Sequence, residues 1–338
     1  MPRISTALIR QAYAHDPLLP LLLRPCRELQ SAQSELRWLR EHGLTLSRAR
    51  NGACRPQPLK NTLKRLCLER SGGTPLQYVI GNQPFGDLEI LCRSGVLIPR
   101  SETESITYHL AKKIIESSPR SRELRILDLC TGTGCISLLL HALLAPHFSR
   151  LEILGLDISP SAISLARQNI VHNVANGALS PRAKQDVHFA LADIFEYDYQ
   201  ATINQTWDIL VSNPPYISPQ ALRTVTARSV RVYEPKTALV PPQSAGLDDA
   251  TGDSFYPRLL DIAKSIRARA VLYEVADVEQ AKRVASLAIE QCRWQEISMW
   301  RDWPQQCSGS DERNVIGGKT VKILGTGQGR AVFLGSKV

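Results

Sequence analysis

Apolar residues recur along the first part of the chain at three- and four-residue steps. This spacing, seen over 28–40 and 58–69, is the period of amphipathic helices with charged residues on the opposite face. A cluster of breaking residues over 71–75 ends this part of the chain. The pattern therefore predicts a small helical domain over 1–73.

The rest of the chain has strand character or alternates between strand and helix. Two short apolar runs, over 77–80 and 88–91, are joined through glycine and proline, which predicts a β-hairpin linker over 74–98. From residue 99 onward, helical and strand-like segments alternate, which predicts a doubly wound α/β domain over 99–338. We expect its helices over 101–115 and 138–144, and its buried strands over 125–129, 151–156, 187–191, 208–212 and 270–275.

Composition and charge narrow the class of protein only a little. The 338 residues are 43% hydrophobic and 22% charged, as in globular proteins, and no window approaches the ~18 apolar residues of a membrane span. The eight cysteines show neither a C-x-x-C pair nor a zinc-type spacing, so we expect reduced thiols and no metal site. The net charge of +9 suits a nucleic acid, an anionic ribonucleoprotein or import into mitochondria, and does not choose among them.

A glycine turn follows the first predicted strand of the α/β domain, in the run D-L-C-T-G-T-G over 128–134. Gly132 and Gly134 let the backbone approach a ligand, and the helix that follows offers free N–H groups. Dinucleotide-binding proteins have a similar turn with a third small residue at the helix start, but Ser137 stands there in this chain, which argues against a pyrophosphate ligand.

Two acids end the strands that follow the glycine turn. Asp157 lies where a carboxylate can accept both hydroxyls of an adenosine ribose, although an acid here can equally cap the helix that begins after Ser159. Asp193 ends the next strand, where an adenine amino group needs an acceptor. Three strand-end sites in succession favour a nucleoside pocket more than any one of them does.

The sequence Asn-Pro-Pro-Tyr follows the strand over 208–212 directly. Two consecutive prolines cannot extend a sheet or enter a helix interior, so the loop holds Asn213 and Tyr216 in a fixed relation. Asn-Pro also forms ordinary strand-terminating turns, but this turn lies on the strand that faces the reactive end of a nucleoside cofactor.

This loop suits methyl transfer to a planar NH2 group. The methyl group of S-adenosylmethionine is already electrophilic, so the reaction requires neither a metal nor a nucleophilic side chain. The side-chain oxygen of Asn213 and the carbonyl of Pro214 can accept the two N–H groups of an acceptor, which stabilises positive charge as it develops. Tyr216 offers a flat face for stacking. The motif indicates a planar amine or amide without identifying it.

The chain resembles the HemK/PrmC family of release factor glutamine methyltransferases over nearly its whole length. The family's Y-I-x-G hairpin and I-P-R-P-E-T segment match the runs Y-V-I-G over 78–81 and I-P-R-S-E-T over 98–103. The glycine turn, Asp157, Asn-Pro-Pro-Tyr and Glu234-Pro235 then follow in family order. The hairpin with its arginine–acid tail separates this family from other enzymes that carry Asn-Pro-Pro-Tyr.

The resemblance implies a fold, a substrate and a set of contacts. The fold is a Rossmann-like class I methyltransferase domain that uses S-adenosylmethionine, preceded by a small helical domain that recognises the substrate. The substrate is the glutamine of a Gly-Gly-Gln tripeptide in a class I peptide chain release factor, methylated on its side-chain amide nitrogen. Catalysis falls to Asn213, Pro214 and Tyr216, and substrate binding to these residues with Pro215, Arg100 and Glu102. The expected cofactor contacts are Asp128, Cys130, Thr131, Gly132, Thr133, Gly134, Asp157, Asp193, Ile194 and Asn213.

The chain departs from the family pattern at several places. Cys130 replaces the first glycine of the turn, and Ser101 replaces a proline. The segment over 241–253 is longer and differently composed, and extra residues over 173–185 predict a surface insertion. None of these departures removes a motif that carries chemistry.

Two other functions compete with this one. An N6-adenine methyltransferase acting on DNA or RNA uses the same chemistry and suits the positive charge, but the chain has no basic, aromatic-rich recognition segment. The third possibility is a methyltransferase-like scaffold that binds a partner without catalysis, and the intact Asp157, Asn213 and Tyr216 argue against it. We therefore expect a monomer with a release factor as its partner, without a membrane or direct nucleic-acid partner.

The first fifteen residues fit two interpretations. They contain Arg3 and Arg10 but no acid before Asp16, as in a mitochondrial presequence, and they equally suit the first helix of the folded domain. Together with the resemblance to organellar family members, this start predicts a mitochondrial location, with the cytoplasm as the alternative.

Overall fold

The computed structural model describes residues 3–49, 59–117, 123–196, 199–203, 205–242, 250–306 and 312–336. The chain divides into two units. We call Met1–Asn82 with Ala227–Tyr233 the helical unit, and Gln83–Thr226 with Glu234–Val338 the sheet unit.

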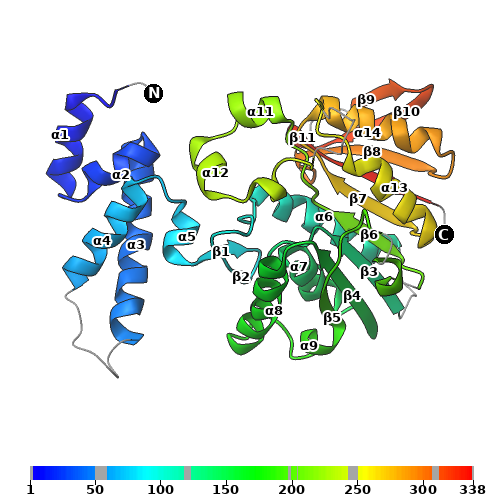
Figure 1. Ribbon diagram of the computed structural model, residues 1–338, viewed down its shortest axis with the longest axis horizontal. Coiled ribbons are helices and arrows are strands. Elements are labelled where there is room, and N and C mark those ends of the chain that lie inside the picture. Colours follow the sequence, from blue (N-terminus) through cyan, green and yellow to red (C-terminus); the bar gives the residue numbers. More distant parts are fainter. Residues whose placement is uncertain are drawn as a thin grey trace. The chain divides into compact units, whose positions relative to one another are not determined.

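Amphipathic helices form the helical unit, and their apolar faces share one core. Its elements are α1 (Thr6–His15), α2 (Leu19–Cys26), α3 (Leu29–Ala49), α4 (Leu59–Ser71), α5 (Leu76–Ile80) and α12 (Arg228–Tyr233) (Figure 1). Leu22, Leu39 and Leu66 come from three different helices and are buried together in this core. The helices predicted over 28–40 and 58–69 are confirmed as α3 and α4.

The apolar run over 77–80 belongs to helix α5, so the strand predicted there is wrong. Gly81 ends the helix with a φ of 87°, and its N–H donates to the carbonyl of Gln77 at 2.8 Å. Leu76 and Val79 lie three residues apart and pack into the helical core. A run of four apolar residues fits either a short helix or a buried strand, and here the glycine at the C-cap decides. The hairpin follows as β1 (Asn82–Phe85) and β2 (Leu88–Leu91).

Apart from the hairpin β1-β2, the described strands of the sheet unit form one sheet in the order β5-β4-β3-β6-β7-β11-β8-β10-β9. The strands are β3 (Glu123–Leu129), β4 (Arg150–Asp157), β5 (Val187–Leu191), β6 (Ile209–Ser212), β7 (Ala270–Glu274), β8 (Glu296–Trp303), β9 (Glu312–Ile316), β10 (Lys319–Leu324) and β11 (Thr326–Gly335). Strands β3 to β7 pair in parallel with one another and confirm the five strands predicted from the sequence. Strand β11 lies antiparallel between β7 and β8 and was not predicted.

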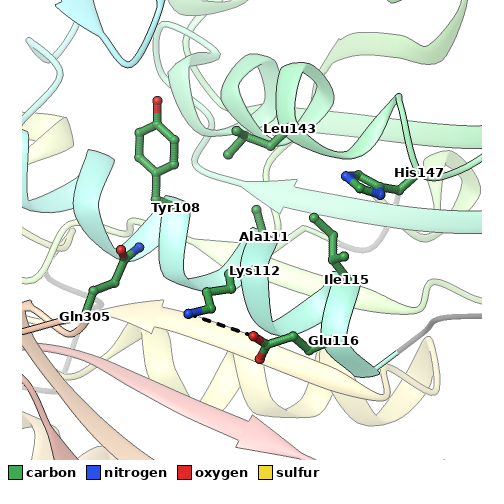
Figure 2. Close-up of a pocket in the computed structure, with 8 residues that line it drawn as sticks. All are labelled: Tyr108, Ala111, Lys112, Ile115, Glu116, Leu143, His147 and Gln305. Carbon is green, nitrogen blue, oxygen red and sulfur yellow. Dashed lines mark ion pairs between the residues drawn. The ribbon is translucent and has the colours of Figure 1, made fainter.

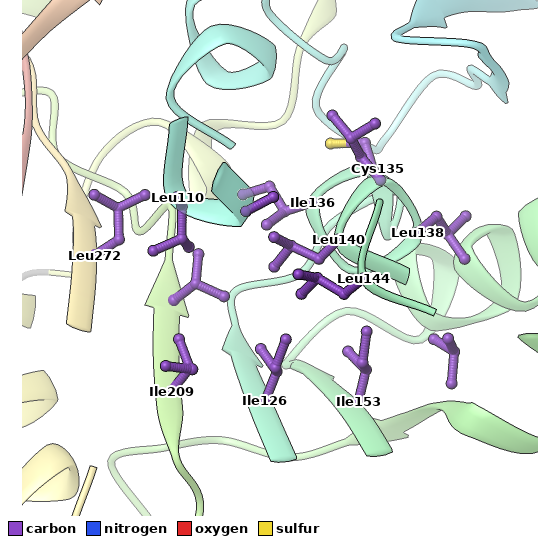
Figure 3. Packing of buried hydrophobic residues seen from close by; sticks show 14 of the residues in the cluster. Leu110, Ile126, Cys135, Ile136, Leu138, Leu140, Leu144, Ile153, Ile209 and Leu272 are labelled. Atoms are coloured by element: carbon purple, nitrogen blue, oxygen red, sulfur yellow. The ribbon is translucent and has the colours of Figure 1, made fainter. Parts of the chain in front are cut away.

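Helices cover both faces of this sheet, which confirms the doubly wound arrangement (Figure 1). They are α6 (Ser101–Ser117), α7 (Cys135–Leu144), α8 (Pro160–Ala175), α13 (Phe255–Ser265) and α14 (Val278–Glu290), with the short α9 (Ala183–Asp186), α10 (Tyr199–Thr202), α11 (Pro219–Thr224) and η1 (Lys236–Ala238). Successive strand residues point to opposite faces, so Ile126 packs with α6, α7 and α8 while Leu127 packs with α13 and α14. Figure 3 shows Leu140 and Leu144 of α7 above Ile126 and Ile153. Among the described helices, none is long and apolar enough to cross a membrane.

Two buried asparagines of α8 join the hairpin to the rest of the sheet unit. The side-chain Nδ2 of Asn173 donates to the carbonyl of Glu89 at 3.0 Å, and its Oδ1 accepts the Glu89 N–H at 2.9 Å. Oδ1 of Asn169 accepts the N–H of Leu91 at 2.7 Å, and its Nδ2 donates to the carbonyl of Thr133 at 2.9 Å. The two side-chain amides thus pair with β2 as a neighbouring strand would.

The segment over 173–185, which the sequence predicts to be a surface insertion, is exposed at most positions but not throughout. Asn173 lies within α8 and is fully buried, and Leu179 and Ala183 belong to the hydrophobic core. The polar start of this segment suggested a surface loop because a buried asparagine and an exposed one look alike in a sequence. Most of the other unusual segment, over 241–253, lies outside the described residues.

Asn173→Ala should lower the free energy of unfolding by about 2 kcal/mol, because it leaves the backbone N–H and carbonyl of Glu89 without these partners. Gln168→Ala is the matched control on the same helix, since Gln168 bonds only to the exposed hydroxyl of Ser164 at 3.2 Å, and it should change stability by less than about 0.5 kcal/mol. Urea denaturation measures both values. Equal stability of the two variants would show that the hairpin does not depend on Asn173.

Candidate functional site

The parallel strands of the sheet end at one edge, and the residues predicted to carry function follow those ends. Leu129 of β3 is in register with Leu156 of β4 and Ser212 of β6, which is in register with Tyr273 of β7. The carboxyl ends of parallel strands border the crevice where open α/β sheets bind their ligands. The structure therefore brings the glycine turn, Asp157, Asp193 and Asn213 to one edge, after β3, β4, β5 and β6 respectively.

Backbone bonds to the neighbouring strand β4 hold the glycine turn. The N–H of Thr131 donates to the carbonyl of Leu156 at 3.0 Å, and the N–H of Gly132 donates to Oδ2 of Asp157 at 2.9 Å. Cys130 and Gly132 both have a positive φ, of 62° and 56°. This backbone conformation costs a residue with a Cβ about 1 kcal/mol, so the sequence departure at Cys130 introduces local strain. Burial raises the pKa of its thiol, so Cys130 stays uncharged at neutral pH.

The two glycines of the turn serve different purposes. A Cβ at Gly134 would lie 2.6 Å from the ring of Phe189 on β5, so this glycine allows the turn to pack against the sheet. A Cβ at Gly132 would meet no atom within 4 Å, so the open side of the turn lies at Gly132. The structure therefore leaves open space beside Gly132, whereas the space beside Gly134 is filled by Phe189. The side chains of Thr131 and Thr133 are buried. The N–H and the carbonyl of Thr131 are bonded to Leu156 and Gly134, and the carbonyl of Thr133 accepts from Asn169.

Asp128 holds the glycine turn from inside. Its side chain is 0% exposed, and its Oδ2 accepts the hydroxyls of Thr131 at 2.7 Å and Ser137 at 2.6 Å. Burial raises the pKa of this carboxyl to about 6, while the two hydroxyls oppose the rise. In the sequence analysis, Ser137 served only to argue against a pyrophosphate ligand. In the structure, its hydroxyl helps to hold Asp128 beneath the glycine turn. Among the described residues, Oδ1 of Asp128 finds no hydrogen-bond partner.

Asp157 is oriented by backbone groups on both sides. Its Oδ1 accepts the N–H of Ser159 at 2.8 Å, and its Oδ2 accepts the N–H of Gly132. The N-cap of α8 is Ser159, whose hydroxyl accepts the N–H of Ala162 at 3.3 Å, so the capping role weighed for Asp157 belongs to Ser159. Burial raises the pKa of Asp157, and these backbone N–H groups oppose the rise. Each carboxylate oxygen keeps a further lone pair that a hydroxyl can use.

Asp193 and Ile194 differ in what they offer a ligand. Asp193 is partly exposed, and its Oδ1 accepts the N–H of Phe195 at 2.9 Å. The side chain of Ile194 lies in the core between β3 and α13, and its carbonyl accepts Nε of Arg258 at 2.7 Å. The side chain of Ile194 is therefore turned into the protein, and its backbone N–H is the group left for a contact with a cofactor.

The Asn-Pro-Pro-Tyr loop begins where β6 ends. The hydroxyl of Ser212 donates to the carbonyl of Leu129 at 2.8 Å and ties the loop to the glycine turn. Nδ2 of Asn213 lies 3.5 Å from Oγ1 of Thr103, and the hydroxyl of Tyr216 donates to Oε1 of Glu274 at 3.0 Å. Both prolines are buried. The loop therefore has the fixed shape that its prolines predict, and two of its side chains are anchored by polar partners from other elements.

Glu274 and Gln280 support this loop, and the sequence analysis missed both. Glu274 ends β7, is 2% exposed, and accepts hydrogen bonds from Thr103 at 2.7 Å and from Tyr216. Gln280 donates from Nε2 to the carbonyl of Tyr216 at 3.2 Å. A sequence signal was available for Glu274, which ends the apolar run V-L-Y-E over 271–274. An acid at the end of a buried strand needs hydrogen-bond partners, so it indicates polar side chains nearby.

A partly buried ion pair anchors the segment before α6. Nη2 of Arg100 lies 2.7 Å from Oε1 of Glu234, whose side chain is 0% exposed, and Oε2 accepts the N–H of Ile98 at 3.2 Å. Glu102 accepts the hydroxyl of Ser101 at 3.0 Å and is partly exposed. Glu234 therefore holds the segment before α6 through Arg100 and Ile98, and Glu102 presents a carboxylate at the start of α6.

A cavity of about 430 Å³ lies away from these residues (Figure 2). It is lined by Tyr108, Ala111, Lys112, Ile115 and Glu116 of α6, Leu143 of α7, His147 and Gln305. No residue of the glycine turn or of the Asn-Pro-Pro-Tyr loop lines this cavity, so it is separate from the candidate site. Within the described parts of the chain, no three acids, histidines or cysteines form a group that could hold a metal.

Comparisons with known proteins identify the domain and its relatives. A family described as a methyltransferase domain matches residues 120–248. The mitochondrial MRF1 N(5)-glutamine methyltransferase MTQ1 of Saccharomyces cerevisiae is 37% identical over 243 residues, which is 71% of this chain and 68% of that protein. A probable MRF1 mitochondrial N(5)-glutamine methyltransferase of Schizosaccharomyces pombe is 32% identical over 310 residues, covering 87% of this chain and 91% of that protein. The release factor glutamine methyltransferase of Chlorobaculum tepidum is 34% identical over 216 residues, covering 63% of this chain and 66% of that protein.

The sheet, its strand-end turn and the matched domain define a methyltransferase of the α/β class. Within that class, the chain belongs to the family of release factor glutamine methyltransferases.

Proposed function

We propose that the chain transfers a methyl group from S-adenosylmethionine to the side-chain amide nitrogen of a glutamine, in the Gly-Gly-Gln motif of a class I peptide chain release factor. The observation that carries this proposal is the anchored Asn-Pro-Pro-Tyr loop beside the glycine turn, linked to it through Ser212 and Leu129. The family of the chain supports the choice of a glutamine amide over other planar NH2 groups.

The residues at the sheet edge fit the nucleoside part of this cofactor. The open side of the turn at Gly132 admits a ligand close to the backbone, and Asp157 keeps lone pairs for two ribose hydroxyls. Asp193 offers an accessible carboxylate after the next strand. When bound, S-adenosylmethionine supplies an electrophilic methyl group.

The chain's own contribution is to bind and orient the acceptor amide. Asn213 and the carbonyl of Pro214 accept its two N–H groups, and the resulting bonds strengthen as positive charge develops on the nitrogen. The ring of Tyr216 is fixed by the bond from its hydroxyl to Glu274, so it forms a rigid wall for the planar amide. Positioning of this kind supplies a large part of the acceleration in a reaction that needs no nucleophilic side chain.

Asp157→Ala and Asn213→Ala should affect different steps. Asp157→Ala should weaken binding of S-adenosylmethionine roughly tenfold or more, because the ribose hydroxyls lose their acceptor. Asn213→Ala should lower the rate of methyl transfer about a hundredfold or more and weaken cofactor binding much less. Calorimetric titration measures the binding, and single-turnover transfer measures the rate. Unchanged affinity in Asp157→Ala would place the cofactor elsewhere.

The substrate is tested in the same assay with tritiated methyl groups. The acceptors are a release factor, its variant with the glutamine of Gly-Gly-Gln replaced, duplex DNA, single-stranded DNA and RNA. The proposal expects label on the unaltered release factor alone. Label on nucleic acid, or equal label on both release factor forms, would favour the N6-adenine alternative, and binding of the release factor without any label would favour the non-catalytic scaffold.

We also propose that the helical unit recognises the release factor, because its described residues carry no chemistry-bearing cluster while they form a separate core. A chain that begins at Gln83 should still bind S-adenosylmethionine, provided that it folds, but should methylate the whole release factor poorly. Thermal denaturation controls for folding. Full activity of the shortened chain on the whole release factor would contradict this assignment.

The proposed location is the mitochondrion, with the cytoplasm as the alternative. The support comes from the basic, acid-free first fifteen residues and from relatives that are named as mitochondrial enzymes. We expect a full chain with a C-terminal fluorescent tag to coincide with a mitochondrial marker. A purely cytosolic signal would reject the proposal.

A further inference from the structure

Four polar side chains form a continuous network from the buried end of β7 to the Asn-Pro-Pro-Tyr loop. Oε2 of Glu274 lies 2.7 Å from Oγ1 of Thr103, and Oε1 lies 3.0 Å from the hydroxyl of Tyr216. Oγ1 of Thr103 lies 3.5 Å from Nδ2 of Asn213. The four residues come from β7, α6 and the loop after β6, so the network joins three elements that are distant in sequence.

The chemistry of these groups determines the direction of each hydrogen bond. An ionised carboxylate only accepts hydrogen bonds, so Thr103 and Tyr216 both donate their hydroxyl protons to Glu274. Thr103 has then used its single proton, and its oxygen can only accept from a further partner. The amide end of Asn213 that faces Thr103 must therefore be the NH2 group. An oxygen there would face another oxygen with no proton between them, so even a contact of 3.5 Å distinguishes the two ends of the amide.

The surroundings of Glu274 bear on its charge. Burial raises the pKa of this carboxyl, while the Thr103 bond, the positive charge of Arg330 and the Tyr216 bond oppose the rise and favour the carboxylate. Arg330 lies on the adjacent strand β11 and is itself held by Asp302 at 2.8 Å. The hydroxyls and the arginine thus supply the donors and the positive charge that a buried carboxylate needs.

We propose that Glu274, acting through Thr103, is a positioning residue that turns Oδ1 of Asn213 toward the crevice. Because the NH2 group of Asn213 is held on the Thr103 side, its oxygen is presented to an N–H group of the incoming amide. Glu274 does not touch the substrate; it sets the direction of the hydrogen bonds that end at Asn213. This inference rests on the proposed function, since it assigns the orientation of the residue that accepts the glutamine amide.

A second support holds the backbone of the same loop and does not depend on Glu274. Gln280 is 1% exposed, and the two protons of its side-chain NH2 group are shared among Oδ1 of Asp253 at 2.8 Å and the carbonyls of Tyr216 and Gly252, each at 3.2 Å. A Cβ at Gly252 would lie 2.3 Å from the carbonyl oxygen of Tyr216, so the two backbone segments are in close approach. Since Gln280 fixes the backbone, the network of Glu274 is left to determine the orientation of the side chains.

Thr103→Val and Thr103→Ser form a matched pair for this inference. Valine has nearly the shape of threonine but lacks the hydroxyl, so kcat for methyl transfer to the release factor should fall about tenfold while KM for the release factor and the affinity for S-adenosylmethionine change little. Serine keeps the hydroxyl and should restore most of kcat. Similar losses in both variants, or a loss confined to KM, would overturn the positioning role.

Glu274→Gln tests the direction of the hydrogen bonds at almost constant volume. A glutamine amide presents one NH2 group, which can donate to Thr103 and thereby release the Thr103 proton toward Asn213, so kcat should again fall about tenfold. In the Asn213→Ala background, Thr103→Val should lower kcat no further, because Thr103 acts through Asn213. Full additivity of the losses would contradict the inference. If Asn213→Ala alone retains full activity, the proposed function fails, whereas a loss in Asn213→Ala with none in Thr103→Val rejects only the role of Glu274.

Discussion

A carboxylate buried at the end of a strand must find hydrogen-bond donors, because an unpaired buried charge costs several kcal/mol. Two such carboxylates organise the edge of this sheet. Asp128, the residue before the last of β3, accepts hydrogen bonds from the hydroxyls of Thr131 and Ser137. Glu274, the last residue of β7, accepts hydrogen bonds from the hydroxyls of Thr103 and Tyr216. The first acid holds the glycine turn and the start of α7 together. The second holds the start of α6 and the Asn-Pro-Pro-Tyr loop.

The difference between what could and could not be predicted follows from this arrangement. The glycine turn and the Asn-Pro-Pro-Tyr loop are visible in the sequence because glycine and proline restrict the backbone locally. The partners that orient them are remote: Thr103 and Glu274 are 171 residues apart in the chain. A single sequence contains no signal that pairs such residues, so Tyr216 was given only a stacking face, and the bond from its hydroxyl to Glu274 was missed.

The errors in the predicted fold have equally specific causes. The central strands β6 and β7 are almost entirely buried and form apolar runs, and β3, β4 and β5 keep buried apolar residues along their length, which is why all five were found. Strand β9 has no buried residue and lies at the edge of the sheet, so it carries no apolar run. The strand predicted over 77–80 is a helix because Gly81 caps it. The segment predicted as a surface insertion begins with a buried residue because Asn173 uses its polar side chain to pair with the backbone of β2.

The two buried acids also differ in a way that suits their positions. Asp128 uses one carboxylate oxygen for both hydroxyls, and burial raises its pKa to about 6 from the 3.8 of an ordinary aspartate. Because the unfolded chain loses this proton near pH 3.8 and the folded chain only near pH 6, the free energy of unfolding decreases as the pH rises from about 3.8 through about 6. Glu274 divides its two oxygens between two elements, and each of its hydroxyl partners loses the freedom to donate elsewhere. Asp128 thus fixes the shape of a backbone turn, whereas Glu274 joins two elements and, in the role that we propose, orients the side chain of Asn213 through Thr103.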